Sequence, residues 1–95
     1  MLNKYEAIFI LDSDLGEDKI QALVEKFKNL LETSAQLESI DEWGKRKLAY
    51  LIQDKSEGYY VLVNFSSEPD FPKEFERNLK ITDGVLKYMI IRKND

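Results

Sequence analysis

The order in which helical and extended patterns follow one another is what most constrains the fold of this chain. Apolar residues recur at helical spacing across residues 17–34, namely Ile20, Leu23, Val24, Phe27, Leu30 and Leu31. A second, shorter pattern begins near Pro72 and consists of Phe71, Phe75 and Leu79, with Asp83-Gly84 closing it. We therefore predict two amphipathic helices, each with a single apolar face that must pack against another layer.

Four extended segments alternate with these helices. Residues 4–12, 36–53, 59–65 and 85–92 are rich in aliphatic and aromatic residues, and a polar turn over 54–58 joins the middle two as a hairpin. In the order β-α-β-β-α-β, two one-faced helices can cover only one side of a four-stranded sheet. Short connections and right-handed crossovers then favour a ferredoxin-like α+β sandwich with an antiparallel sheet and both helices on one face. The 95 residues suffice for one such domain, residues 1–95.

The residue types that are missing narrow the possible functions. The chain contains neither histidine nor cysteine, which excludes ordinary nucleophilic triads, thiol chemistry and typical zinc sites. Its 4 glycines are isolated, so no glycine-rich loop is available for a phosphate group. Acidic pairs such as Glu17/Asp18 and Asp41/Glu42 are expected at helix starts and on the surface. We therefore predict that the protein is not an enzyme and binds no metal or cofactor.

Two small-molecule functions also occur on sandwiches of this size. An acylphosphatase needs a cationic cradle after the first strand, but residues 13–18 are acidic here and would repel phosphate. A regulatory domain that binds a small effector and dimerises through its sheet remains an alternative, although the same loop offers only Gly16 as a binding glycine.

Residues 43–50 (WGKRKLAY) place three consecutive cations, Lys45, Arg46 and Lys47, in an otherwise acidic protein. A strand would expose these charges on both of its faces, and a polyanion such as RNA would relieve their mutual repulsion. Gly44 predicts a β-bulge that re-aims them. The alternative is a solvated edge strand that uses its cations to block aggregation.

The aromatic neighbours of these cations and the overall charge leave RNA binding possible. Trp43 and Tyr50 flank the basic run and are suited either to stacking on RNA or to packing against the protein. The net charge of −4 comes entirely from residues 1–40, and binding depends on the local field at the contact. No apolar run is long enough to cross a bilayer and no signal peptide is evident, which predicts a cytoplasmic location.

The strand patterns predict a second surface that lacks a cover. In the third strand, Tyr60 and Leu62 oppose Tyr59, Val61, Val63 and Phe65; in the fourth, Val85, Met89 and Ile91 are expected to oppose Leu86, Tyr88 and Ile90. Both faces of the sheet are therefore apolar, whereas the open face of an antiparallel sheet is commonly polar. We expect a partner on the open face or edge, the alternative being strand twist with ordinary exposed aliphatic residues.

These motifs give the chain a resemblance to the bacterial family of small-subunit ribosomal protein six over nearly its whole length. The specific part is the run Gly44-Lys45-Arg46-x-Leu48-Ala49-Tyr50, and supporting matches are Lys4-Tyr5-Glu6, Gly58-Tyr59-Tyr60 and the segment 83–88. The resemblance implies that the protein is located in the ribosome and is a structural constituent of the small ribosomal subunit. Family members pair with small-subunit protein eighteen and bind the central domain of the small-subunit ribosomal RNA during platform assembly.

The resemblance also implies roles for individual residues. Lys45, Arg46 and Lys47 are expected to contact RNA phosphates. Further RNA contacts are expected from Lys4, Lys87 and Arg92, while Trp43 and Tyr50 either stack on RNA or pack. The expected surface for the partner protein is Tyr59, Tyr60, Tyr88 and Ile90. Such a partner would account for the doubly apolar sheet and would supply positive charge that this acidic chain lacks.

Overall fold

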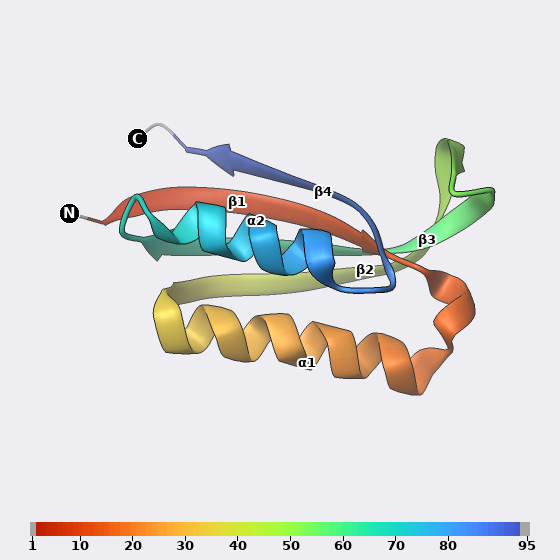
Figure 1. The fold of residues 1–95 in the computed structure, drawn as a ribbon, viewed down its shortest axis with the longest axis horizontal. Helices are drawn as coiled ribbons and strands as arrows, with labels where there is room; N and C mark the ends of the chain where they lie inside the picture. The colour runs from red at the N-terminus through yellow and green to blue at the C-terminus, as the bar shows by residue number, and fades with distance from the viewer. Residues whose placement is uncertain (1, 94–95) are drawn as a thin grey trace.

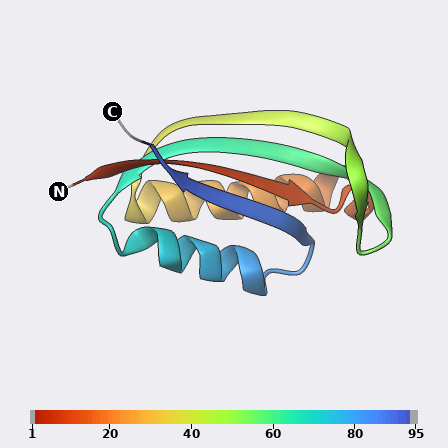
Figure 2. The same cartoon turned by 90° about the horizontal axis from the view of Figure 1, so that it is seen from above.

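The computed structural model describes residues 2–93, which form a four-stranded sheet and two helices in the predicted order (Figure 1). The elements are β1 (Asn3–Leu11), a short 3-10 helix η1 (Ser13–Leu15), α1 (Glu17–Ser34), β2 (Gln36–Ile52), β3 (Lys55–Ser67), α2 (Phe71–Ile81) and β4 (Val85–Arg92). The sheet is antiparallel with the strand order β2-β3-β1-β4. Both helices lie on the same side of it (Figure 2), so the predicted ferredoxin-like sandwich is confirmed.

Aromatic rings form the centre of the layer between helices and sheet. Phe9, Phe27, Phe65 and Phe75 are all fully buried, and their rings meet edge to face. Phe9 and Phe27 have centroids 5.2 Å apart, which joins β1 directly to α1. Alternate residues of a strand point to the same face, so the odd-numbered residues of β1 from Tyr5 to Leu11 all enter this layer. We call this side of the sheet the covered face and the opposite side the open face.

The start of α1 combines backbone capping with charge. The Asp12 carboxylate accepts a hydrogen bond from the Asp14 amide (3.0 Å) and so caps η1. The N-cap of α1 itself is Gly16, which has no side chain to offer, and Glu17 and Asp18 place negative charge in the first turn. The predicted acidic helix start is confirmed. Negative charge at this position stabilises the helix, because the N-terminal end of the helix dipole is positive.

The β2–β3 hairpin differs from its predicted form. Its turn is only Gln53-Asp54, both at positive φ (+50° and +63°), and β3 begins at Lys55 rather than at Tyr59. The predicted turn over 54–58 was therefore too long, because the polar residues there pair with β2 in spite of their loop-like composition. The predicted bulge at Gly44 is confirmed by a register shift between Glu42 and Gly44 and by the glycine's φ of +85°.

The end of this hairpin extends beyond the rest of the sheet. Tyr59 is the first residue of β3 that pairs with β1, so residues 45–58 form a largely two-stranded extension, which we call the arm. Within it the pairing passes from Lys47 with Glu57 to Ile52 with Lys55, so that residues 48–51 face Ser56 alone. This irregularity bends the arm, and in both views it turns across the end of the sheet toward β4 (Figures 1 and 2).

A register shift also changes the expected faces of β4. Ile10 pairs with Lys87 and Leu11 pairs with Val85, which leaves Leu86 as an extra residue. Val85 therefore joins Tyr88 and Ile90 against the core, and its predicted grouping with Met89 and Ile91 was wrong. Strict alternation fails here because a β-bulge adds one residue to one strand of the pair.

Candidate nucleic-acid interface and the open face of the sheet

The three adjacent cations lie where the arm leaves the sheet. Lys45 pairs with Tyr59, Arg46 with Gly58 and Lys47 with Glu57. Because successive residues of a strand alternate between faces, Arg46 projects on the open-face side and the two lysines on the other. All three residues are in contact with solvent, and β2 is an edge strand, so they line one exposed rim of the molecule.

Arg46 and Lys47 keep their charge available for a partner. Lys45 Nζ lies 3.6 Å from Glu57 Oε1 in an exposed ion pair, which is a weak interaction in water. The ion pairs found among residues 2–93 involve neither Arg46 nor Lys47. An uncompensated pair of cations on a narrow, protruding strand is well placed to contact phosphate groups.

The structure does not bring Lys4 and Arg92 to this rim. Arg92 pairs with Tyr5, and its guanidinium donates a hydrogen bond to Asn3 Oδ1 (3.3 Å). Tyr5 lies six residue steps of β1, about 20 Å of strand, from Leu11 beside the arm. The predicted RNA contacts therefore fall into two groups at opposite ends of the sheet.

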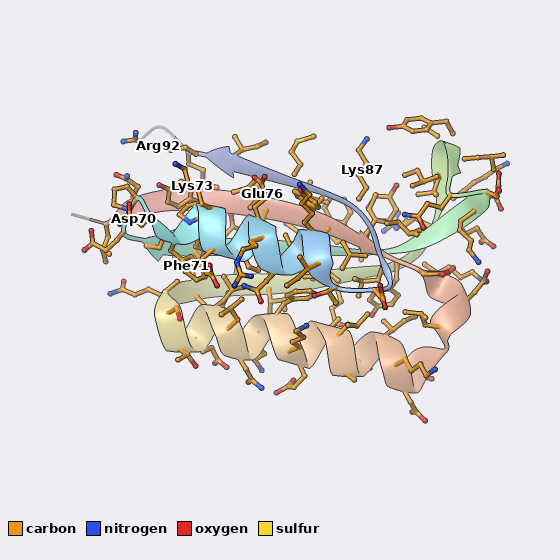
Figure 3. The ribbon with its side chains drawn as sticks, in the orientation of Figure 1. Asp70, Phe71, Lys73, Glu76, Lys87 and Arg92 are labelled. Carbon is orange, nitrogen blue, oxygen red and sulfur yellow. The ribbon has the colours of Figure 1, made fainter. Side chains whose placement is uncertain are left out.

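Lys87 belongs with the arm. Its side chain leaves β4 on the side away from the helices (Figure 3), and its ammonium donates a hydrogen bond to the Tyr50 hydroxyl. The same ammonium lies 5.1 Å from the centre of the Tyr50 ring. Since β2 and β4 are the two outer strands, this contact bridges the open face from one edge to the other. Tyr50 thus packs against a cation, while 60% of its surface remains exposed.

Trp43 also packs while staying accessible. Its ring stacks on Tyr60 with centroids 6.2 Å apart and planes 13° from parallel. The indole Nε1 donates a hydrogen bond to Asp41 Oδ2 (3.1 Å), and the residue is 41% exposed. The packing role predicted for Trp43 is therefore present on one side of the ring, and stacking on RNA stays a prediction.

The bent arm creates an apolar hollow on the open face. It encloses about 230 Å³ between the arm, β1, β3 and β4, and its lining includes Ile8, Ile10, Leu48, Ile52, Tyr60 and Met89. The Tyr50–Lys87 contact lies in its wall. Met89 and Ile91, which lie beside one another on this face of β4, are 51% and 47% exposed. The predicted doubly apolar sheet is confirmed.

Of the four residues expected on the partner surface, only Tyr60 lies on the open face. Tyr59, Tyr88 and Ile90 pack against the helix-covered core. The Tyr59 hydroxyl donates a 2.7 Å hydrogen bond to Glu42 Oε1, which also accepts one from Gln21 of α1 (3.0 Å). Burial, together with the Glu42 carboxylate, raises the pKa of Tyr59 above its usual value.

Sequence reasoning did not assign to the partner surface the residues that form most of the open face: Ile8, Ile10, Leu62, Met89 and Ile91. The signal for them was the alternation in β1, where the odd-numbered residues are the buried set and Ile8 and Ile10 therefore face the other way. In β4 alternation did not distinguish the two faces, because each alternating set contains three apolar residues and one cation.

The arm is also tied to the turn that precedes α1. Lys55 Nζ donates a hydrogen bond to Asp14 Oδ2 (2.8 Å) and lies 3.7 Å from Asp12 Oδ2. The hydrogen bond and the charge of Lys55 hold the pKa of Asp14 below its usual value, and Asp14 and Asp12 raise that of Lys55. The acidic loop that argued against a phosphate site thus acts as an acceptor for a lysine of the arm.

Other kinds of site are not evident in the part of the chain that the structure describes. Across residues 2–93, no group of three acidic side chains converges as a metal site would require. Neither of the helices there is long and apolar enough to span a membrane.

Comparison with known proteins agrees with this picture. A family model described as "Ribosomal protein S6" matches residues 4–92. The small ribosomal subunit protein bS6 of Caldanaerobacter subterraneus subsp. tengcongensis is 55% identical over 95 residues, covering 99% of this chain and 100% of that protein. The bS6 of Alkaliphilus metalliredigens is 55% identical over 91 residues, covering 96% and 97%.

Solved structures show the same fold. The crystal structure of 30S ribosomal protein S6 from Thermotoga maritima superposes with a TM-score of 0.92 at 25% identity, covering 98% of this chain and 89% of the other. The C-terminal domain of the MgtC protein from Mycobacterium tuberculosis gives a TM-score of 0.60 at 13% identity, which is a likeness of fold alone.

The family match decides the broad function. Its members are small-subunit ribosomal proteins, which are structural components of the cytoplasmic ribosome rather than enzymes. The predicted ribosomal role is therefore confirmed and takes precedence over the effector-binding alternative. On the strength of a match to nearly its whole length, the chain belongs to the ribosomal protein S6 family.

Proposed function

We propose that this protein binds the central domain of the small-subunit ribosomal RNA as one half of a pair with small-subunit protein eighteen. The observation that carries the proposal is the position of two different exposed surfaces side by side. One is the rim with Arg46 and Lys47, whose charges are not neutralised by a described carboxylate. The other is the apolar open face around the hollow.

The rim has the properties of a phosphate-binding surface. Cations on a protruding strand can approach the RNA backbone without bringing the acidic start of α1 close to it, and affinity then depends on the local charge. Trp43 and Tyr50 at either side present ring faces suited to a base or a ribose. Lys4 and Arg92 lie about 20 Å away and would contact a second stretch of RNA backbone.

The open face has the properties of a protein interface. It combines a hollow with exposed aliphatic and aromatic side chains, the features of the apolar centre of an interface. An RNA backbone would gain little from Ile8, Met89 or Ile91, whereas apolar side chains of protein eighteen would bury them. We therefore assign the rim to the RNA and the open face to the protein partner.

The test is a titration of the purified protein against a central-domain RNA fragment, with and without protein eighteen, at two salt concentrations. Wild-type protein should bind tightly only with its partner. The double variant Arg46→Ala/Lys47→Ala should bind about tenfold or more weakly and show a shallower dependence of affinity on salt, by about one unit of slope for each lost phosphate contact.

The matched control is Lys73→Ala/Lys80→Ala. Both lysines are exposed on α2, where Figure 3 labels Lys73, and their removal changes the net charge by the same amount. It should bind almost as well as the wild type. If the two double variants lose affinity equally, the rim has no special part in RNA binding.

A further inference from the structure

The arm needs support to hold a fixed direction. It is a two-stranded extension, and such a ribbon is only marginally stable by itself. Besides the Tyr50–Lys87 hydrogen bond, it packs on the sheet through Leu48, which is 7% exposed and lies beside Gly58, close to Ile10 of β1. Rotation of the arm about this contact would move Arg46 and Lys47 relative to the rest of the molecule.

Lys55 joins the arm to a part of the molecule that is itself fixed. Its ammonium lies between the carboxylates of Asp14 (2.8 Å) and Asp12 (3.7 Å). The Asp12 backbone amide donates to the Gly84 carbonyl (2.7 Å), and its carbonyl accepts from the Leu15 amide (3.2 Å). Asp12 is thereby held to the start of β4 and to η1, so the lysine is bound to a rigid turn.

We propose that Lys55 is a positioning residue, whose clamp on Asp12 and Asp14 fixes the direction in which Arg46 and Lys47 face the RNA. The inference rests on the proposed function and adds a residue that itself need not touch the RNA. A clamped arm loses less conformational freedom when it binds, and this preorganisation strengthens binding.

The clamp and simple electrostatics predict opposite effects of removing Asp14 on RNA affinity. Asp14 is an exposed negative charge near the basic rim, and the charge of Lys45, after that of Lys55, helps to lower the pKa of Asp14. If Asp14 acted only through its charge, its removal would strengthen the attraction between the protein and RNA. If it acts as the acceptor that holds Lys55, its removal frees the arm and weakens binding instead.

The deciding experiment compares Asp14→Ala with Asp18→Ala in the RNA titration with protein eighteen. Asp18 is an exposed acid in the first turn of α1, so the two variants change the net charge equally. We expect Asp14→Ala to bind RNA about twofold to fivefold more weakly than wild type, and Asp18→Ala to bind equally well or slightly more tightly. Equal or tighter binding by Asp14→Ala overturns the clamp.

A second measurement separates positioning from charge and from general loss of structure. Backbone order parameters of residues 45–58 in the free protein should fall in Asp14→Ala and Lys55→Met, while those of the helices stay near the rigid value of about 0.85. Lys55→Arg, which retains a cation that reaches both carboxylates, should restore them. Unchanged order in Lys55→Met overturns the proposal. If wild-type protein binds no RNA, the proposed function fails, and these order parameters still decide whether Lys55 fixes the arm.

Discussion

The two faces of the sheet are built from alternate residues of the same strands, yet they end in different states. On the covered face, four phenylalanine rings from β1, β3 and both helices meet and are fully buried. On the open face, side chains of similar character surround a hollow of about 230 Å³. Met89 and Ile91 there remain about half exposed.

This difference separates the residues that stabilise the fold from those that are available to a partner. Burial of apolar surface is the main favourable term in folding, and the side chains of the covered face are already buried in the folded protein. The open face keeps comparable surface in water, so an apolar partner gains from the same effect on binding. Substitutions on the two faces should therefore affect different measurements.

The largest effect on stability is expected from Phe75→Ala. Phe75 is fully buried and its ring contacts Phe9, Phe27, Phe65 and Phe71. Loss of the ring leaves a cavity at the centre of the covered face and should lower the free energy of unfolding by about 3–5 kcal/mol. Urea denaturation followed by circular dichroism measures it. A loss below about 1 kcal/mol would mean that the covered face is not the main source of stability.

Gly58→Ala tests the close contact between the arm and β1. A Cβ at this position would collide with Ile10 Cγ2 and lie 3.5 Å from Leu48 Cδ2. Since the neighbours are packed, we expect a loss of about 1–3 kcal/mol in the free energy of unfolding. The second variant Ile10→Ala removes the colliding methyl, so the double variant should lose less than the sum of the two single losses. Strict additivity would contradict the close approach of arm and sheet.

Met89→Glu should have its effect on binding rather than on stability. Met89 is 51% exposed beside the hollow, so a polar replacement should change the free energy of unfolding by less than about 0.5 kcal/mol. A carboxylate in the apolar interface should weaken binding to protein eighteen about tenfold or more, measured by calorimetry. Ile81→Glu is the matched control, because Ile81 is 63% exposed at the end of α2, on the helix side. Equal losses for both variants would remove the open face as the binding surface.

Sequence patterns predicted the covered face better than the arm. The clean spacing of Ile20, Val24, Phe27 and Leu31 fixed α1 as Glu17–Ser34, because a helix with one apolar stripe has one way to pack. The arm had no such pattern. Residues 55–58 are polar and still pair as a strand, and the bend that brings Tyr50 to Lys87 follows from an irregular register. Contacts between residues far apart in the chain, such as Lys55 with Asp14, carry no local signal.

The smallest predicted effect concerns the pH dependence of stability and the edge of the covered face. Tyr59 packs at that edge. Burial and the nearby Glu42 carboxylate raise its pKa in the folded protein above the value of about 10 expected in the unfolded chain. As pH rises past about 10, the unfolded chain loses its phenolic proton first, so the contribution of Tyr59 to stability is present below that pH and declines above it.

The variant Tyr59→Phe isolates the contribution of the Tyr59 hydroxyl to the free energy of unfolding. Wild type should be the more stable of the two at pH 8, because its hydroxyl is bonded to Glu42, and this advantage should shrink between pH 8 and about pH 11. Urea midpoints of both proteins at the two pH values measure the change, with the other tyrosines and the lysines common to both. A constant difference would show that the Tyr59 hydroxyl is as free to ionise in the folded protein as in the unfolded chain. Tyr59 would then not count as part of the buried core, and the hydrogen bonds among Gln21, Glu42 and Tyr59 would behave as solvent-exposed interactions.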